Sequence, residues 1–129
     1  MTNTFKNILL AAMLLLGGSQ VGYAQDLDKG LEAFLRKDYA AALKEWRPLA
    51  EQGDVKAQNR LSGMYYYGWG VTKDIVYAHM WLNIAASNGN ERAAEFRDDI
   101  AENELTPSQL EEAQRLAREW FEKYTNGVK

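Results

Sequence analysis

The chain has 129 residues, a formal net charge of −3 and no cysteine. A chain of this length holds one small domain, and its acidic balance offers no basic surface for nucleic acid. The lack of cysteine excludes disulfides, thiolate metal ligands and a lipid anchor on an acylated cysteine. The packing of side chains alone must therefore hold the fold together.

The N-terminal stretch has the layout of a secretory signal peptide. Lys6 gives a short positive region, and residues 8–16 form an apolar run. Small residues at Gly22 and Ala24 then favour a cut between Ala24 and Gln25. The apolar run is shorter than the about 20 residues that a membrane span needs.

We therefore expect residues 1–24 to be a cleaved signal and residues 25–129 to form the domain. This predicts a periplasmic or secreted protein with no stable membrane insertion once the signal is removed. The alternative is an uncleaved segment that tethers the domain to the membrane.

After the signal, helical spacing of apolar residues runs through the chain, and strand signals are hard to find. The first expected helix covers residues 27–36, with Leu27, Leu31, Phe34 and Leu35 facing inward. Five further helices are expected, each starting after a residue that can cap a helix N-terminus. These caps are Asp38, Asp54, Asp74, Asn90 and Thr106, the last forming a capping box with Gln109.

Short loops between these six helices predict three antiparallel helical hairpins. A shift of 36 residues aligns cap and small-residue positions with one another. The aligned pairs are Asp38 with Asp74, Ala42 with Ala78, Ala50 with Ala86, Gly53 with Gly89, and Ala57 with Ala93. We therefore expect an all-α fold, a short α/α solenoid in which hairpins stack through small side chains.

The stretch "GMYYYGWGVTKD", residues 63–74, lies between the third and fourth expected helices. Gly68 and Gly70 invite comparison with a phosphate-binding loop, but the third glycine and the preceding strand of such a loop are missing. We therefore interpret the stretch as a structural corner of the hairpin.

The same stretch carries a family resemblance. Residues 57–89 closely resemble one Sel-one-like repeat (SLR), an α-helical hairpin repeat related in architecture to tetratricopeptide repeats. The matching residues are Ala57, Leu61, Gly63, Tyr65, Gly68, Gly70, Val71, Asp74, Ala78, Trp81, Ala85, Ala86 and Gly89. Partial repeats lie on either side, and residues 107–125 resemble the terminal capping helix of bacterial members. The resemblance implies an SLR domain that binds other proteins.

Reactive chemistry is not indicated, and we expect no catalytic residue, metal site or cofactor. His79 is the sole histidine, and it shares a helix stripe with Asn83 and Ser87, so we expect a surface or groove residue. The acidic run at residues 97–104 is expected to be solvated, and Glu111 is expected to pair with Arg115.

The aromatic residues around the corner are the best candidates for contact with a partner. Tyrosine and tryptophan bring rigid area and a polar group to interfaces. Helical spacing predicts that Trp81 and one or two tyrosines are buried. We expect Tyr66, Trp69 and Tyr77 to make partner contacts.

The sequence thus predicts an exported, non-catalytic scaffold whose partner is another protein or peptide. One alternative is an enzyme, or an accessory to one, that acts on polymers of the cell envelope. Another is the tethered adaptor described above. A homodimer formed through an exposed hairpin end is a variant of the scaffold, because short arrays leave apolar ends to cover.

Overall fold

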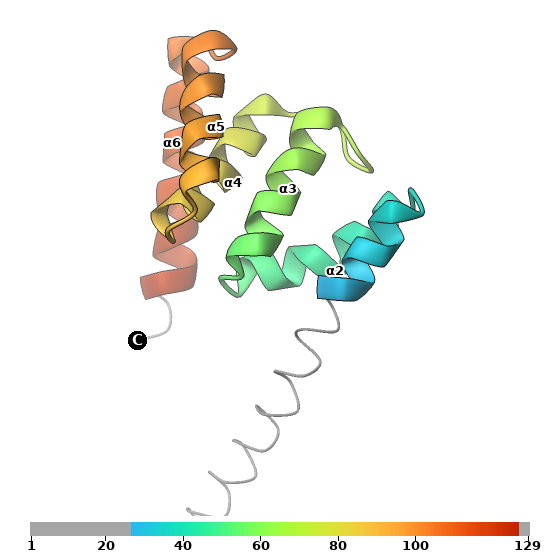
Figure 1. The fold of residues 1–129 in the computed structure, drawn as a ribbon. Coiled ribbons are helices and arrows are strands. Elements are labelled where there is room, and N and C mark those ends of the chain that lie inside the picture. The colour runs from blue at the N-terminus through green and yellow to red at the C-terminus, as the bar shows by residue number, and fades with distance from the viewer. Residues whose placement is uncertain (1–26, 127–129) are drawn as a thin grey trace, which may run out of the picture.

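The structure, a computed structural model, describes residues 27–126. The expected signal, residues 1–24, and the cut between Ala24 and Gln25 lie outside the described residues. Every regular element within 27–126 is a helix, so the all-α prediction is confirmed. The first described helix covers residues 27–35. It is followed by α2 (Tyr39–Glu51), α3 (Val55–Tyr67), α4 (Ile75–Ser87), α5 (Glu91–Asn103) and α6 (Pro107–Phe121). Helix α6 continues into the π-helical turn η1 (Glu122–Asn126). Figure 1 shows α2 at one end of the array and α5 and α6 toward the other.

Each helix from α2 to α6 begins at the cap that the sequence indicates. The carboxylate of Asp54, for example, accepts a hydrogen bond from the Ala57 amide at 2.7 Å. Thr106 and Gln109 form the reciprocal capping box at the start of α6. Because the first amides of a helix have no partner within the helix, these side chains fix where each helix starts.

The 36-residue repeat is visible in the helix bounds. α4 begins and ends 36 residues after α2, and α5 begins and ends 36 residues after α3. The connections differ, however. Residues 68–74 form a long corner between α3 and α4, whereas residues 104–106 alone join α5 to α6.

The corner rests directly on α2. Gly70 has a φ of +73°, and a Cβ built on it would lie 2.7 Å from the Cβ of Tyr39. Only glycine satisfies both the backbone conformation and this close approach. The interpretation of the stretch as a structural corner is therefore confirmed.

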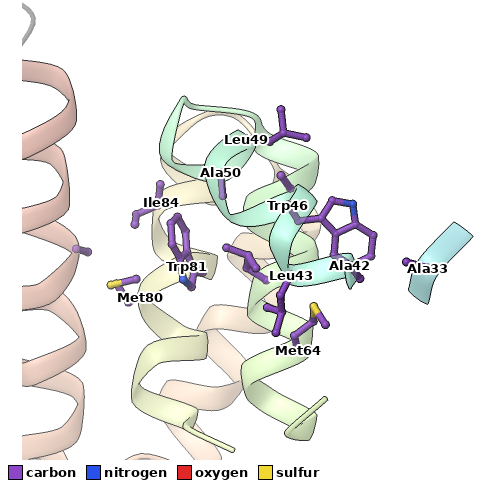
Figure 2. Packing of buried hydrophobic residues seen from close by; sticks show 13 residues of the cluster. Ala33, Ala42, Leu43, Trp46, Leu49, Ala50, Met64, Met80, Trp81 and Ile84 are labelled. Atoms are coloured by element: carbon purple, nitrogen blue, oxygen red, sulfur yellow. The ribbon is translucent and has the colours of Figure 1, made fainter. Parts of the chain in front are cut away.

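The core is organised around α4, which packs against α3, α5 and α6. One apolar cluster joins α2, α3 and α4 and includes Trp46 and Trp81, while Met80 points from α4 toward α6 (Figure 2). A second cluster lies between α4 and α5 and contains Leu82 and Ile100. Because α4 contributes to both clusters, residues on nearly every side of this helix are buried.

A buried amide links two helix ends inside this array. Gln58 is fully buried and donates from Nε2 to the carbonyl oxygen of Ala50, near the end of α2, at 3.0 Å. Its Oε1 accepts from Nδ2 of Asn88, at the end of α4, at 3.3 Å. A buried polar group needs such partners, so Gln58 fixes the register of one hairpin on the next.

One expected core position is wrong. Leu35 was expected to face inward with Phe34, but its side chain is 72% exposed. It is the last residue of the helix over 27–35, where the chain already turns toward α2. The spacing of apolar residues did not reveal that the helix ends at Leu35, so that its side chain lies outside the core.

Candidate interaction surface

An unbroken series of aromatic contacts crosses the first helix of each hairpin. Ring centroids lie 5.1 Å apart for Phe34 and Trp69, 4.5 Å for Trp69 and Tyr67, 4.9 Å for Tyr67 and Tyr66, and 5.0 Å for Tyr66 and Phe96. We call these five residues the aromatic row. It extends from the helix over 27–35, across the end of α3 and its corner, to α5.

Tyr67 is the most exposed member of the row, with 56% of its surface open to solvent. Its ring is nevertheless held on both sides, since it stacks on Trp69 and meets the edge of Tyr66. A large aromatic side chain that is exposed yet fixed in place is typical of an interface anchor.

Tyr66 fixes the end of the row nearest α5. Its hydroxyl donates to the Glu104 carboxylate at 2.6 Å, and the Lys73 ammonium lies 5.6 Å from the ring centroid. The hydrogen bond to Glu104, followed by desolvation and the charge of Glu104, raises the pKa of Tyr66 to about 12. Glu104 is exposed, as expected for the acidic run. Its hydrogen bond also holds the side chain of Tyr66 in place.

A small pocket adjoins the other end of the row. It has a volume of about 170 Å³ and is lined by Phe34, Trp46, Asn59, Arg60, Gly63 and Trp69. The guanidinium of Arg60 lies 5.0 Å from the centroid of the Trp46 ring. Its Nε is buried and has no hydrogen-bond partner among the described residues. The pocket therefore combines aromatic walls with one cationic donor.

The three predicted contact residues do not share one surface. Tyr66 and Trp69 belong to the aromatic row, whereas Tyr77 lies in a second pocket of about 280 Å³ between α2, α4 and α6. There Tyr77 meets the edge of Tyr65 at 4.5 Å and of Trp81 at 6.3 Å. Burial is the main cause that raises the pKa of Tyr77. Partner contact by all three residues stays a prediction.

The expectation that His79 lies on the surface or in a groove is wrong. Its side chain is only 2% exposed, because α4 is covered by three neighbouring helices. Nδ1 has no hydrogen-bond partner in the described part of the chain. Burial, and then the positive charge of Arg97, lower the pKa of this imidazole.

The expected pairing of Glu111 with Arg115 is also wrong. Arg115 bonds instead to Glu112, at 2.6 Å, and to Glu119. These bonds lower the pKa of Glu112 and raise that of Arg115.

Within residues 27–126, three or more metal-ligating side chains do not gather in one place. The aromatic row and its pocket are suited to binding through ring faces and a guanidinium.

Sequence reasoning missed Phe34, Tyr67, Phe96, Arg60 and Gly63 as members of this surface. Phe34 and Phe96 are far from the corner in sequence, so no local pattern connects them to it. Consecutive tyrosines on a helix point in different directions, and the sequence could not show that Tyr67 rather than Tyr66 is exposed. One signal was present, since Tyr67 follows Gly63 by one helical turn and so shares its face.

Comparison with known proteins agrees with this geometry. A family model described as the Sel1 repeat matches residues 55–90 and 109–123. The first segment covers α3, the corner and α4, and the second covers most of α6. The SLR resemblance is thereby confirmed.

Two relatives extend the comparison. An uncharacterized protein of Neisseria meningitidis serogroup B is 49% identical over 49 residues, which are 38% of this chain and 10% of that protein. The crystal structure of c5321, a protective antigen present in uropathogenic Escherichia coli strains and displaying an SLR fold, is similar with a TM-score of 0.68 and 34% identity. That match covers 79% of this chain and 23% of the antigen chain. The chain thus spans only a tenth to a quarter of the length of these relatives.

No helix in the part of the chain from residue 27 to 126 has both the length and the apolar character to cross a membrane. The repeat in the helix bounds, the matched family model and the shared SLR fold agree with one another. The described residues therefore form an α solenoid of helical hairpins that carries Sel1 repeats and is similar in fold to an SLR protein.

Proposed function

We propose that the protein is an exported, non-catalytic scaffold that binds another protein or peptide along the aromatic row. The observation that carries this proposal is the continuity of the row across three helices, with Tyr67 exposed at its centre. Aromatic residues of this kind dominate the binding energy of many interfaces, because they bring rigid contact area.

The row is also preorganised. Tyr66 is tied to Glu104, and Trp69 is packed between Phe34 and Tyr67. Side chains that are already held in place lose little conformational entropy when a partner arrives. More of the contact free energy then appears as affinity.

Export is supported by the signal-like layout of residues 1–24. Every described helix lies within residues 27–126, so cleavage between Ala24 and Gln25 leaves these helices intact. We expect the intact mass of the protein recovered from the periplasm or medium to lack residues 1–24. A full-length mass would favour the tethered form.

The binding proposal is tested by photocrosslinking in cells that export the protein. A photoreactive residue replaces Tyr67, and a matched control replaces Gln114, which is exposed on α6. We expect a discrete crosslinked product from position 67 and none from position 114. A product of twice the chain mass would make a second copy the partner.

A second variant supplies the control for the site itself. Tyr67→Ser should remove most crosslinking from a photoreactive residue placed at Asn59, which lies beside the row. The fold should be unaffected, because Tyr67 is exposed. Equal products from positions 67 and 114, or undiminished product in Tyr67→Ser, would contradict the proposal.

A further inference from the structure

Gly63 is a glycine that the protein's own packing does not require. It lies within α3, and a Cβ built on it would meet no atom within 4 Å. Gly30 is different, since its Cβ would lie 2.1 Å from Nε1 of Trp46. A glycine inside a helix costs about 1 kcal/mol relative to alanine. At Gly63 no internal contact requires the glycine. Its missing side chain instead leaves room in the pocket lined by Phe34, Trp46 and Trp69.

Arg60 gives this pocket an unmatched charge. Its guanidinium packs on Trp46, its Nε is buried without a partner, and it forms no ion pair with any carboxylate of the described residues. Nε itself has almost no accessible surface, so a ligand meets the other two guanidinium nitrogens. The guanidinium is the side chain best matched to a carboxylate. The matching ligand group is therefore an anion with acceptor oxygens.

The size and walls of the pocket narrow the choice further. Its volume of about 170 Å³ is below the about 300 Å³ at which pockets for whole small ligands begin. It therefore accommodates a single residue. An internal Asp or Glu would leave the aromatic walls unfilled, because its stem is short and its head is polar. A chain's last residue carries an apolar side chain and a carboxylate together.

We propose that the pocket receives the C-terminal residue of a partner polypeptide. The apolar side chain lies over Gly63 and against Phe34 and Trp69, and the terminal carboxylate accepts from Arg60. This inference rests on the proposed function, because the pocket shares Phe34 and Trp69 with the aromatic row.

Two small probes test it directly. N-acetyl-leucine carries the terminal carboxylate, whereas N-acetyl-leucinamide is the same molecule without the charge. We expect the acid to shift the NMR indole signals of Trp46 and Trp69 and to bind at least about ten times more tightly than the amide, since a charged hydrogen bond is the stronger kind. Equal affinities, or no shift with either probe, would overturn the proposal.

Two variants separate binding from folding. Arg60→Gln should bind the acid and the amide equally, whereas Arg60→Lys should keep part of the preference. Gly63→Ala should lose binding of both probes while unfolding at a higher temperature, because alanine favours the helix and fills only the pocket. Unchanged binding in Gly63→Ala refutes the assignment, and so does a retained acid preference in Arg60→Gln.

Failure here and failure of the proposed function look different. If crosslinking from position 67 persists while both probes fail, the pocket assignment is wrong and the scaffold proposal stands. If the acid binds selectively while position 67 yields no product, the pocket stands and the aromatic row is not the docking surface.

Discussion

Gly70→Ala should destabilise the protein through two separate effects. An L-residue in the left-handed conformation costs about 1–2 kcal/mol, and Gly70 has a φ of +73°. The new methyl group would also lie 2.7 Å from the Cβ of Tyr39 on α2. Overpacking of this kind adds about 1–3 kcal/mol. The free energy of unfolding should therefore fall by about 2–5 kcal/mol.

Gly68→Ala is the matched control. Its φ of +72° is nearly the same, but the nearest atoms to its new Cβ, on Lys73, are 3.3 Å away. It should lose the backbone cost of about 1–2 kcal/mol, together with a smaller cost for shifting Lys73 by a few tenths of an ångström. The difference between the two variants then isolates the contact of the corner with α2.

Urea unfolding followed by far-UV circular dichroism measures both variants, and thermal unfolding gives an independent value. For a domain of this size each 1 kcal/mol lowers Tm by about 4–8 °C. Tryptophan fluorescence adds a local readout, since Trp69 stacks on Tyr39 at 6.0 Å. If Gly70→Ala is no less stable than Gly68→Ala, the corner does not pack against α2 as described.

Three further predictions follow from particular contacts. Burial lowers the pKa of His79, so the unfolded chain binds the proton more tightly, and stability should decline as pH falls below about 6.5. His79→Gln should flatten this decline in urea titrations at several pH values, and an unchanged slope would refute the assignment. Thr106→Ala removes the acceptor of the Gln109 amide and should cost about 1 kcal/mol, which an unaltered urea midpoint would contradict. Glu104→Gln should lower the pKa of Tyr66 from about 12 toward 10, as measured by ultraviolet titration of the phenol, whereas a retained high value would mean that Glu104 is not its cause.

The helix starts were predictable because each depends on a few adjacent residues. Asp38, Asp54, Asp74, Asn90 and Thr106 all cap the helices that they were expected to cap. A cap needs only a short polar side chain and the amides that follow it. Gly53 and Gly89, which the 36-residue repeat aligns, both have positive φ values, and a left-handed residue after a helix is likewise a local requirement.

The surroundings of α4 were not predictable in this way. The spacing identified Trp81 as an inward position, and it is buried. It could not show that His79 and Met80 are buried as well. Their burial depends on α5 and α6, whose positions follow from how the hairpins stack rather than from the sequence of α4 itself.

The sequence by itself determined the helices, their caps, the 36-residue repeat and the SLR resemblance, because these follow from local backbone preferences and from spacing within a single hairpin. Only the tertiary structure decided which aromatic residues form one surface. Phe34, Tyr67 and Phe96 come from separate helices, and their contacts exist only once the hairpins have stacked. The pocket at Gly63 has the same origin, since a missing side chain becomes a feature only when the walls around it belong to other helices.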